Sequence, residues 1–382
     1  MSQQENNKED EILASLPTIR EIPTKRRYWF VRTFGGKLFD YYYETKKVGI
    51  GGNSVPINLI KNAPHDDVTF NSLNSYILSN IFPDKPGEAT KLSNQLIDFY
   101  HKINIDDIVL MPSENSNYIA FGKITSSIKK IDTPREKFFH NDKLEEYPNK
   151  FREVEWLKIM SKSDVIGDLR AMFSSHMGLT NIDQYSEFIE GNLSTFFIKE
   201  DFYYSSLFVD LNEDDELNAF DLQRYLESIT KLYTHFCIAN GIDENEELFL
   251  KIKIQSQGSN IWKWMKNAGS FGIAGIIGMA IVGSDPTLKI NREDGFEASL
   301  KGNLFQNISG IYKDFVETNL DEEEKKIKIE NDKIDLLDKK KKLGFLTPEE
   351  IEKYSIQLVD SAKALQIRSV ESKGVDIEEL KK

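Results

Sequence analysis

The sequence predicts an α+β protein with a small β-barrel and helices first, a second α+β domain next, and a charged helical hairpin last. Three observations support this order. Short aromatic and β-branched runs dominate residues 25–190, strand patterns flank an amphipathic helix in residues 191–316, and glutamate and lysine crowd residues 317–382. Residues 1–24, polar and interrupted by two prolines, are expected to form a flexible leader.

The first part of the barrel is predicted from its aromatic opening stretch. The run YWFVR at residues 28–32 does not separate apolar from polar positions, so it predicts a strand covered on both faces. The pair Gly35 and Gly36 predicts a turn. Residues 37–47 then predict a helix, and residues 48–53 predict a second short strand that ends in a glycine bend.

The remaining barrel elements follow in order. Residues 89–102 predict a helix because their apolar side chains recur at helical spacing. Residues 108–111 and 118–124 lie on either side of a polar turn and predict two paired strands. The stretch REVEWLKI at residues 152–159 predicts the strand that closes the barrel.

The second domain and the tail have different patterns. Residues 202–210 and 248–255 predict strands, with an amphipathic helix over residues 218–239 between them. In the tail, acid-to-lysine pairs four residues apart predict a solvated helix over residues 321–342. A capping box with proline, TPEE at residues 347–350, predicts the start of another helix. The resulting helical hairpin offers a surface through which copies of the chain can associate.

Charge and cysteine content limit the classes of function. A formal net charge of −13 argues against general coating of nucleic acid, which needs a broad excess of Lys and Arg, but a local basic patch stays open. The single cysteine, Cys237, leaves no internal disulfide framework and no thiolate cluster for zinc. The first residues lack the apolar core of a secretory signal, so a cytoplasmic location is expected.

No catalytic motif is recognisable, so a non-enzymatic protein without metal or cofactor is expected. The histidines are scattered singly, and no phosphate-binding loop is present. Asp294, Glu297 and Lys301 are the nearest match to a magnesium-dependent nuclease site, but they lack the adjacent Glu-x-Lys pattern. A divergent nuclease therefore stays open as an alternative.

Residues 268–284 are uncharged and carry glycines three residues apart at positions 269, 272, 275 and 278. This pattern predicts a helix with a smooth face that lets another backbone approach closely, in a core or at an interface. The length is at the lower limit for crossing a membrane, and Trp262, Lys263 and Trp264 resemble an interfacial anchor. Conditional membrane insertion is the second possibility for this segment.

The sequence of the predicted barrel resembles a known family over residues 27–190. YWFVRTFGGKLFDYYYETKKVGIGGN, at residues 28–53, resembles the opening of the EVE or PUA-like module that precedes the catalytic domain of Mrr-type restriction proteins. Three later stretches resemble the same module and occur in the same order: KLSNQLIDFYHKINIDDIVLMPS, YIAFGKITSSI and YPNKFREVEWLKIMSKSDVIGDLRAMFSS.

The resemblance implies a barrel that senses modified bases in DNA by taking a flipped base into an aromatic pocket. The residues that it implies near the pocket are Trp29, Arg32, Asn53 and Asn94, and those near phosphate are Lys25, Arg26 and Arg27. The chain departs from the family at Gly52, where tryptophan is common, so one stacking wall is missing. Alternatively, aromatics such as Trp29 and Trp156 fill the barrel core.

The leading expectation is therefore a recognition subunit of a prokaryotic antiviral defence system. It would sense nucleic acid, modified or unmodified, or a nucleotide, and signal to an effector protein. The alternatives are a membrane-acting effector that uses residues 268–284 and the divergent nuclease described above.

Overall fold

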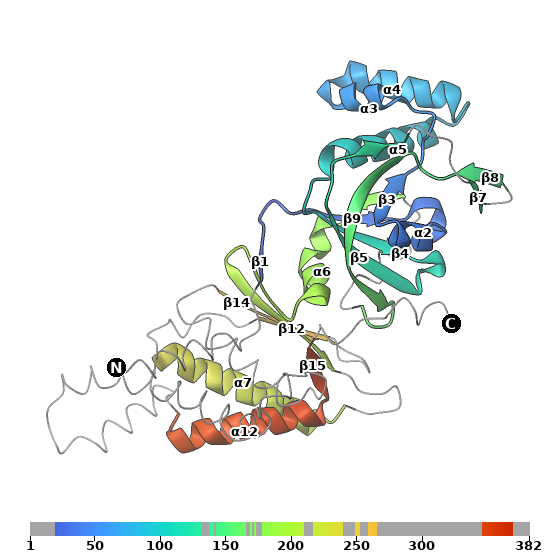
Figure 1. Ribbon diagram of the computed structural model, residues 1–382. Helices are drawn as coiled ribbons and strands as arrows, with labels where there is room; N and C mark the ends of the chain where they lie inside the picture. Colours follow the sequence, from blue (N-terminus) through green and yellow to red (C-terminus); the bar gives the residue numbers. More distant parts are fainter. Residues whose placement is uncertain are drawn as a thin grey trace, which may run out of the picture. The chain divides into compact units, whose positions relative to one another are not determined.

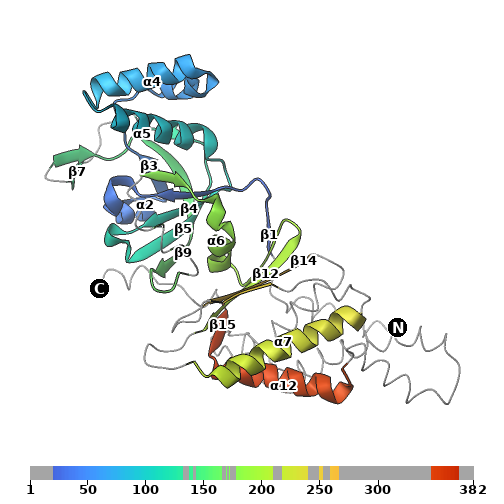
Figure 2. The ribbon, with the colours of Figure 1, turned by 180° about the vertical axis from the view of Figure 1, so that it is seen from behind.

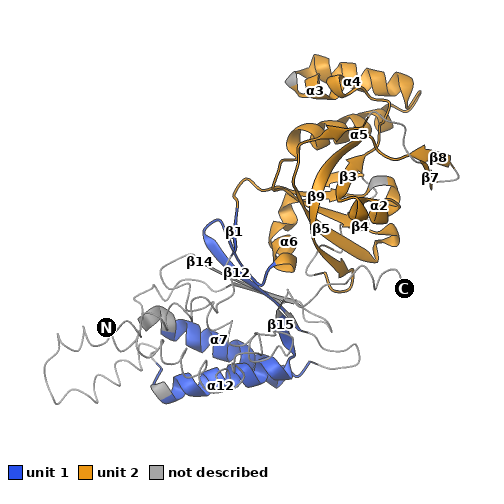
Figure 3. Ribbon diagram, in the orientation of Figure 1, with its two compact units in different colours: residues 1–22, 194–372 blue, residues 23–193, 373–382 orange. Residues whose placement is uncertain are grey.

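The computed structural model describes residues 20–131, 137–140, 143–165, 169, 172, 178–209, 217–239, 249–252, 259–265 and 346–369. Together they form a mixed α+β protein with two compact units, shown in different colours in Figure 3. We call residues 23–193 the half-barrel unit. The described parts of residues 1–22 and 194–372 form the helix-pair unit.

A curled sheet forms the centre of the half-barrel unit (Figure 1). Its strands, in spatial order, are β10 (Leu179–Asn181), β2 (Tyr28–Val31), β4 (Ile108–Pro112), β5 (Tyr118–Ile124), β9 (Lys150–Ser161) and β3 (Lys47–Ile50). The short strand β6 (Lys129–Lys130) also pairs with β9. Strands β2 and β4 are parallel, and the other neighbours in this order are antiparallel.

The sequence pattern explains the centre of this sheet. All residues of β2 are buried, which confirms the prediction of a strand covered on both faces. Strand β9 is long enough to pair with both β5 and β3. The β5–β9 register shifts at Gly122, where a side chain would collide with Val154 and Trp156. Glycine at this bulge therefore allows the two strands to approach and the sheet to curl.

Helices complete the half-barrel unit: α2 (Phe39–Glu44), α3 (Ile57–Asn62), α4 (Asp67–Asn80), α5 (Pro86–Ile97) and α6 (Ser186–Leu193). Helix α5 continues into a π-helical turn at Asp98–Lys102, so the helix predicted over residues 89–102 is confirmed. The buried guanidinium of Arg152 donates hydrogen bonds to the carbonyls of Phe99 and Tyr100 at 2.9 to 3.0 Å. It thereby satisfies carbonyls that the helix end leaves without partners. Desolvation lowers the pKa of Arg152 to about 10.

The helix-pair unit combines a second sheet with two helices. Its strands, in spatial order, are β1 (Arg20–Ile22), β11 (Phe196–Lys199), β12 (Phe202–Val209), β14 (Ser259–Met265) and β13 (Phe249–Ile252), and β15 (Ile367–Ser369) also pairs with β12. Helices α7 (Ala219–Ala239) and α12 (Pro348–Ala364) lie side by side, as both Figure 1 and Figure 2 show. Their apolar side chains share one core with the sheet.

This unit corrects three expectations from the sequence. Residues 20–22, expected in a flexible leader, form a strand that pairs in parallel with β11. The Trp-Lys-Trp run, interpreted as a membrane anchor, belongs to β14 and pairs with β12 and β13. Residues 346–369, expected in a separate tail, supply α12 and β15 to the same compact unit. The segments 268–284 and 321–342 and the acids Asp294 and Glu297 lie outside the described residues.

The start of α12 is fixed by hydrogen bonds. The predicted capping box is confirmed, because Thr347 and Glu350 exchange side-chain and backbone hydrogen bonds. One residue earlier, the backbone N–H of Leu346 donates to Nδ1 of the buried His235 on α7 at 2.8 Å. Desolvation lowers the pKa of His235 to about 4, so the imidazole is neutral and able to accept this bond at neutral pH.

Candidate functional site

Trp29, expected near the ligand pocket, lies in the core of the half-barrel unit. Its side chain is 1% exposed, and the indole nitrogen donates a hydrogen bond to Oδ2 of Asp107 at 3.0 Å. The buried Asp107 also accepts the backbone N–H groups of Arg27, at 3.0 Å, and Asn104, at 2.8 Å. Burial raises the pKa of Asp107, and these hydrogen bonds oppose the rise because they favour the carboxylate. Trp29 thus has the core placement that the sequence left open as the alternative.

The basic residues expected near phosphate have different environments. Nη1 of Arg26 forms an ion pair with Oε1 of Glu190 at 3.0 Å, with 6% and 0% of the two side chains exposed. The same carboxylate oxygen accepts a hydrogen bond from the Tyr28 hydroxyl at 2.8 Å. Lys25 and Arg27 are exposed. Arg26 therefore joins two parts of the fold, and only its neighbours present their charge to solvent.

Asn53 fixes a loop. Its Oδ1 accepts the backbone N–H of Asn149 at 2.9 Å, and its Nδ2 donates to the carbonyl of Tyr147 at 3.2 Å. Next to it, the fully buried Lys150 donates from Nζ to the carbonyl of Gly52 at 2.8 Å. The loop at residues 51–53 is therefore held against the start of β9. Both the oxygen and the nitrogen of the Asn53 amide form hydrogen bonds that hold this loop in place.

Asn94 lies on the exposed side of α5. The inner side of the helix carries Leu92 and Leu96, whose Cδ1 atoms lie 3.6 and 3.4 Å from where a Cβ on Gly52 would be. Asn94 is two residues from each leucine, which places it about 200° around the helix from both. Gly52 has a φ of +83°, a conformation that glycine adopts without strain. A side chain such as tryptophan would be strained at this position.

The structure brings aromatic side chains together at the edge of the half-barrel unit. They form the aromatic cluster, defined as Phe34, Tyr41, Phe138, His140 and Tyr147. The ring of Phe34 is edge-on to Phe138 and His140, with centroids 5.0 and 5.3 Å apart. The ring of Tyr147 lies 5.1 Å from Phe138 and 4.1 Å from Tyr41. All these side chains are partly exposed, unlike the rings of the core.

A small hairpin contributes Phe138 and His140 to the aromatic cluster. Strands β7 (Lys137–His140) and β8 (Lys143–Glu146) form a separate two-stranded sheet that extends away from the main sheet (Figures 1 and 2). Phe138 and His140, on one face, contact Phe34. Phe139 and its cross-strand partner Leu144 are on the other face and are 73% and 54% exposed. Adjacent phenylalanines on this hairpin therefore have opposite environments.

The backbone around Phe34 is strained in a way that fixes its ring. Phe34 has φ 53° and ψ 42°, in the left-handed region that side chains other than glycine, asparagine and aspartate rarely adopt. The same turn lies close to another segment, because a Cβ on Gly36 would be 2.6 Å from the Ser113 carbonyl oxygen. The Cζ atom of Phe34 is 3.9 Å from where a Cβ on Gly51 would be, so the ring adjoins the loop at residues 51–53. Strain of this kind is concentrated at functional sites.

Arg32 lies immediately before this turn. Its Nη2 donates a hydrogen bond to Oγ of Ser116, and its guanidinium lies 5.7 Å from the centroid of the Phe30 ring. Burial lowers the pKa of Arg32. Strand β2, which is 4 residues long, separates Arg32 from Arg27, so their Cα atoms are roughly 16 Å apart. The expected base-reading and phosphate-binding residues therefore do not form one patch.

The structure thus brings Arg32 and Asn53 beside the aromatic cluster. It places Trp29 in the core, Asn94 on the outer face of α5, and the basic residues at the other end of β2. Sequence reasoning missed the contributions of Phe34 and the hairpin. The available signal was the pair KFFH and KLEE separated by Asn-Asp, which is a hairpin pattern.

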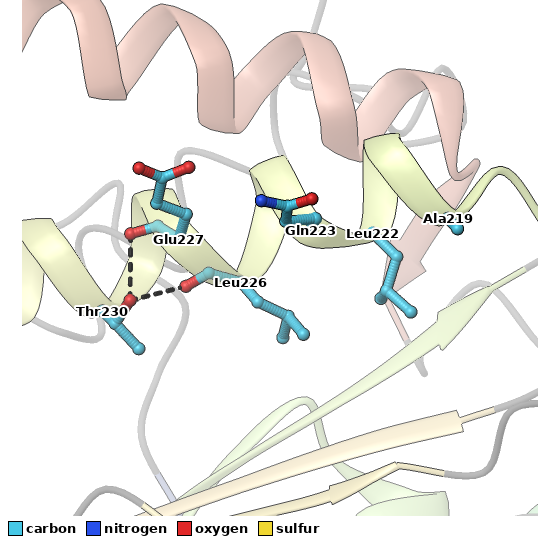
Figure 4. A pocket seen from close by; sticks show the side chains of 6 residues that line it. All are labelled: Ala219, Leu222, Gln223, Leu226, Glu227 and Thr230. Carbon is cyan, nitrogen blue, oxygen red and sulfur yellow. Dashed lines mark hydrogen bonds between the residues drawn. The ribbon is translucent and has the colours of Figure 1, made fainter.

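A groove on the helix-pair unit is a weaker candidate. It has a volume of about 420 Å³ and lies along α7 (Figure 4), lined by Ala219, Leu222, Gln223, Leu226, Glu227 and Thr230. The hydroxyl of Thr230 donates to the carbonyls of Leu226 and Glu227 in its own helix, at 2.9 and 3.0 Å. A ligand site needs polar groups that converge on one point, whereas these residues follow a single helix face.

The described part of the chain contains no group of three or more His, Cys, Asp or Glu side chains that could hold a metal ion. Among the same residues, no helix has both the length and the apolar character needed to span a bilayer. Comparison of the chain with protein-family models, with curated proteins and with solved structures finds no match. The EVE-like interpretation therefore stays a prediction from the sequence.

Proposed function

We propose that the half-barrel unit binds the planar ring of a nucleobase at the aromatic cluster, as the sensing part of a non-enzymatic prokaryotic antiviral defence protein. The observation that carries the proposal is the cluster itself, in which partly exposed rings from two distant segments meet beside the loop at residues 51–53. Aromatic side chains on a rigid scaffold provide stacking surfaces for bases. In this proposal, a separate effector protein carries out the response.

The strained backbone of Phe34 supports a ligand role over a purely structural one. The core of the half-barrel unit is already filled by rings such as Phe30, Phe99 and Phe121, each 0% exposed. Phe34 packs against this core with part of its ring exposed, and its left-handed backbone costs of order 1–3 kcal/mol. The strain is explained if Phe34 must present its ring at a fixed angle to a ligand.

The charge of the protein indicates how a nucleic acid would bind. Arg26 is paired with Glu190, and the whole chain has a net charge of −13. Few counterions would therefore be released on binding, and ring stacking would supply most of the affinity. We expect a shallow dependence of Kd on salt, and a preference for bases that are unpaired or easily flipped.

Titrations of the full chain test the proposal. The ligands are nucleosides, single-stranded oligonucleotides, and matched modified and unmodified duplexes, each at several salt concentrations. Phe138→Ala should weaken binding about 5- to 150-fold, because one stacking contact is worth roughly 1–3 kcal/mol. Phe139→Ala is the matched control and should bind within about twofold of the wild type, since its ring is 73% exposed on the other face.

Thermal unfolding of both variants separates loss of ligand contact from loss of the hairpin. Phe138→Leu keeps an apolar contact to Phe34 and removes the aromatic face, so it should retain stability while losing affinity. Equal affinity of the wild type and Phe138→Leu would contradict a stacking role. Absence of binding to every ligand at low salt would reject the proposed function.

A further inference from the structure

The side-chain amide of Gln95 has a buried nitrogen without a hydrogen-bond partner among the described residues. It lies on α5 between Leu92 and Leu96, the residues that face Gly52. Its Nε2 is buried and has no hydrogen-bond partner in the described part of the chain. Its Oε1 lies 3.3 Å from where a Cβ on Gly178 would be.

The position of Gln95 connects it to the proposed site. The carbonyl of Gly178 accepts a hydrogen bond from the backbone N–H of Arg32 at 2.9 Å, just before the turn that carries Phe34. On its other side, α5 packs through its leucines against Gly52, in the loop that adjoins the Phe34 ring. Gln95 therefore lies against Gly178, whose carbonyl is bonded to the residue two positions before Phe34.

A buried donor without a partner is unfavourable and calls for an explanation. Leaving such a group unpaired costs roughly 1–3 kcal/mol, and most buried polar groups in folded proteins are paired. The amide of Asn53 shows the ordinary situation, because both its oxygen and its nitrogen are hydrogen-bonded. Gln95 carries the donor that the fold leaves available for something that binds.

We propose that Gln95 selects the bound ring, with Nε2 donating a hydrogen bond to a ring carbonyl. This inference rests on the proposed function. The Gln95 side chain is partly exposed, and turning its amide toward a ligand breaks no hydrogen bond of Nε2. An amino group at the same ring position would place a donor against a donor and leave both unpaired. The site should therefore favour bases that carry a carbonyl over those that carry an amino group.

Two pairs of nucleosides test this preference with the full chain. Inosine and adenosine differ by a carbonyl in place of an amino group, and so do uridine and cytidine. The wild type should bind the carbonyl member of at least one pair tenfold or more tightly. Gln95→Leu should abolish the difference, and Gln95→Glu should reduce or reverse it. Asn94→Leu, at the adjacent exposed position, should behave as the wild type.

Stability measurements add a second readout. Since Nε2 has no partner to lose, Gln95→Leu should be as stable as the wild type or more stable. A Gln95→Leu protein that is clearly less stable would show that the amide has a structural partner, and would overturn the inference. So would equal binding of both nucleosides, or a preference retained in Gln95→Leu. Ring binding without preference rejects only the role of Gln95, whereas absence of any ring binding rejects the proposed function as well.

Discussion

The two units bury polar groups in different ways. In the half-barrel unit, the charged side chains of Asp107, Lys150, Arg152 and Glu190 are at most 3% exposed. These side chains form hydrogen bonds that hold particular segments in place. Lys150 holds the loop at Gly52, and Arg152 holds the end of α5. Among the residues described in the helix-pair unit, the buried polar groups are hydroxyls and the neutral His235. The first arrangement fixes particular loops through hydrogen bonds to buried charges, whereas the second joins helices mainly by apolar packing.

The largest expected effect concerns Trp29. It tests whether the hydrogen bond between Trp29 and Asp107 stabilises the core of the half-barrel unit. Trp29→Ala should lower the free energy of unfolding by roughly 3–5 kcal/mol, because it creates a cavity and removes a donor from a buried carboxylate. Urea unfolding of the full chain measures the loss. Leu157→Ala, at an exposed position of β9, is the control and should change little. A Trp29→Ala protein of nearly normal stability that no longer bound ligand would restore the pocket role that the sequence suggested.

The second prediction tests how the stability of the helix-pair unit depends on pH. His235 has a lowered pKa of about 4 because burial disfavours its charged form, and the nearby Glu350 opposes this only in part. The unfolded chain takes up the proton near pH 6.5, so the folded state should lose about 3 kcal/mol as the pH falls from about 6.5 to 4. Unfolding monitored at intervals across this range measures the slope. His235→Phe should be less stable at neutral pH and should lack this part of the slope.

The smallest expected effect concerns Lys150. It tests whether this buried charge supports the loop at residues 51–53 beside the aromatic cluster. Lys150→Met keeps the aliphatic stem but removes the hydrogen bond to the Gly52 carbonyl, and should reduce stability by roughly 2 kcal/mol. Ring binding should weaken as well, since the loop at residues 51–53 adjoins Phe34. Lys143→Met, at an exposed position of β8, is the matched control. If Lys150→Met bound the ligand normally, the buried charges would serve folding alone.

The sequence predicted much of the regular structure of the half-barrel unit, for physical reasons. A strand buried on both faces, such as β2, has an uninterrupted apolar run in its sequence. The sequence of α5 has leucines at helical spacing. The strand β14 was missed because its aromatic and lysine content suggested a membrane boundary. The alternation of Trp and Lys at residues 262–264 has the two-residue period of a strand, which favours the sheet.

The candidate site was less predictable. The helical repeat of α5 was sufficient to place Asn94 opposite the leucines and Gln95 nearer to their side of the helix. The role of Asn53 depends on Asn149, which is 96 positions away along the chain and meets it only because β3 pairs with β9. No local pattern reports such a contact. The left-handed backbone of Phe34 lies in a turn where Gly36 approaches the backbone of Ser113, a contact that no local pattern reports either.

Strand β1 has a consequence for how the chain is divided. It lies immediately before the half-barrel unit in sequence, yet it pairs with β11, which comes immediately after that unit. The half-barrel unit is therefore an insertion in the sequence of the helix-pair unit. The strands that precede and follow the insertion, β1 and β11, pair with each other in parallel. Removing residues 20–22 would strip an edge strand from the helix-pair unit while leaving the half-barrel sequence intact. Both ends of the insert are therefore held in one sheet of its host, by β1 before it and β11 after it.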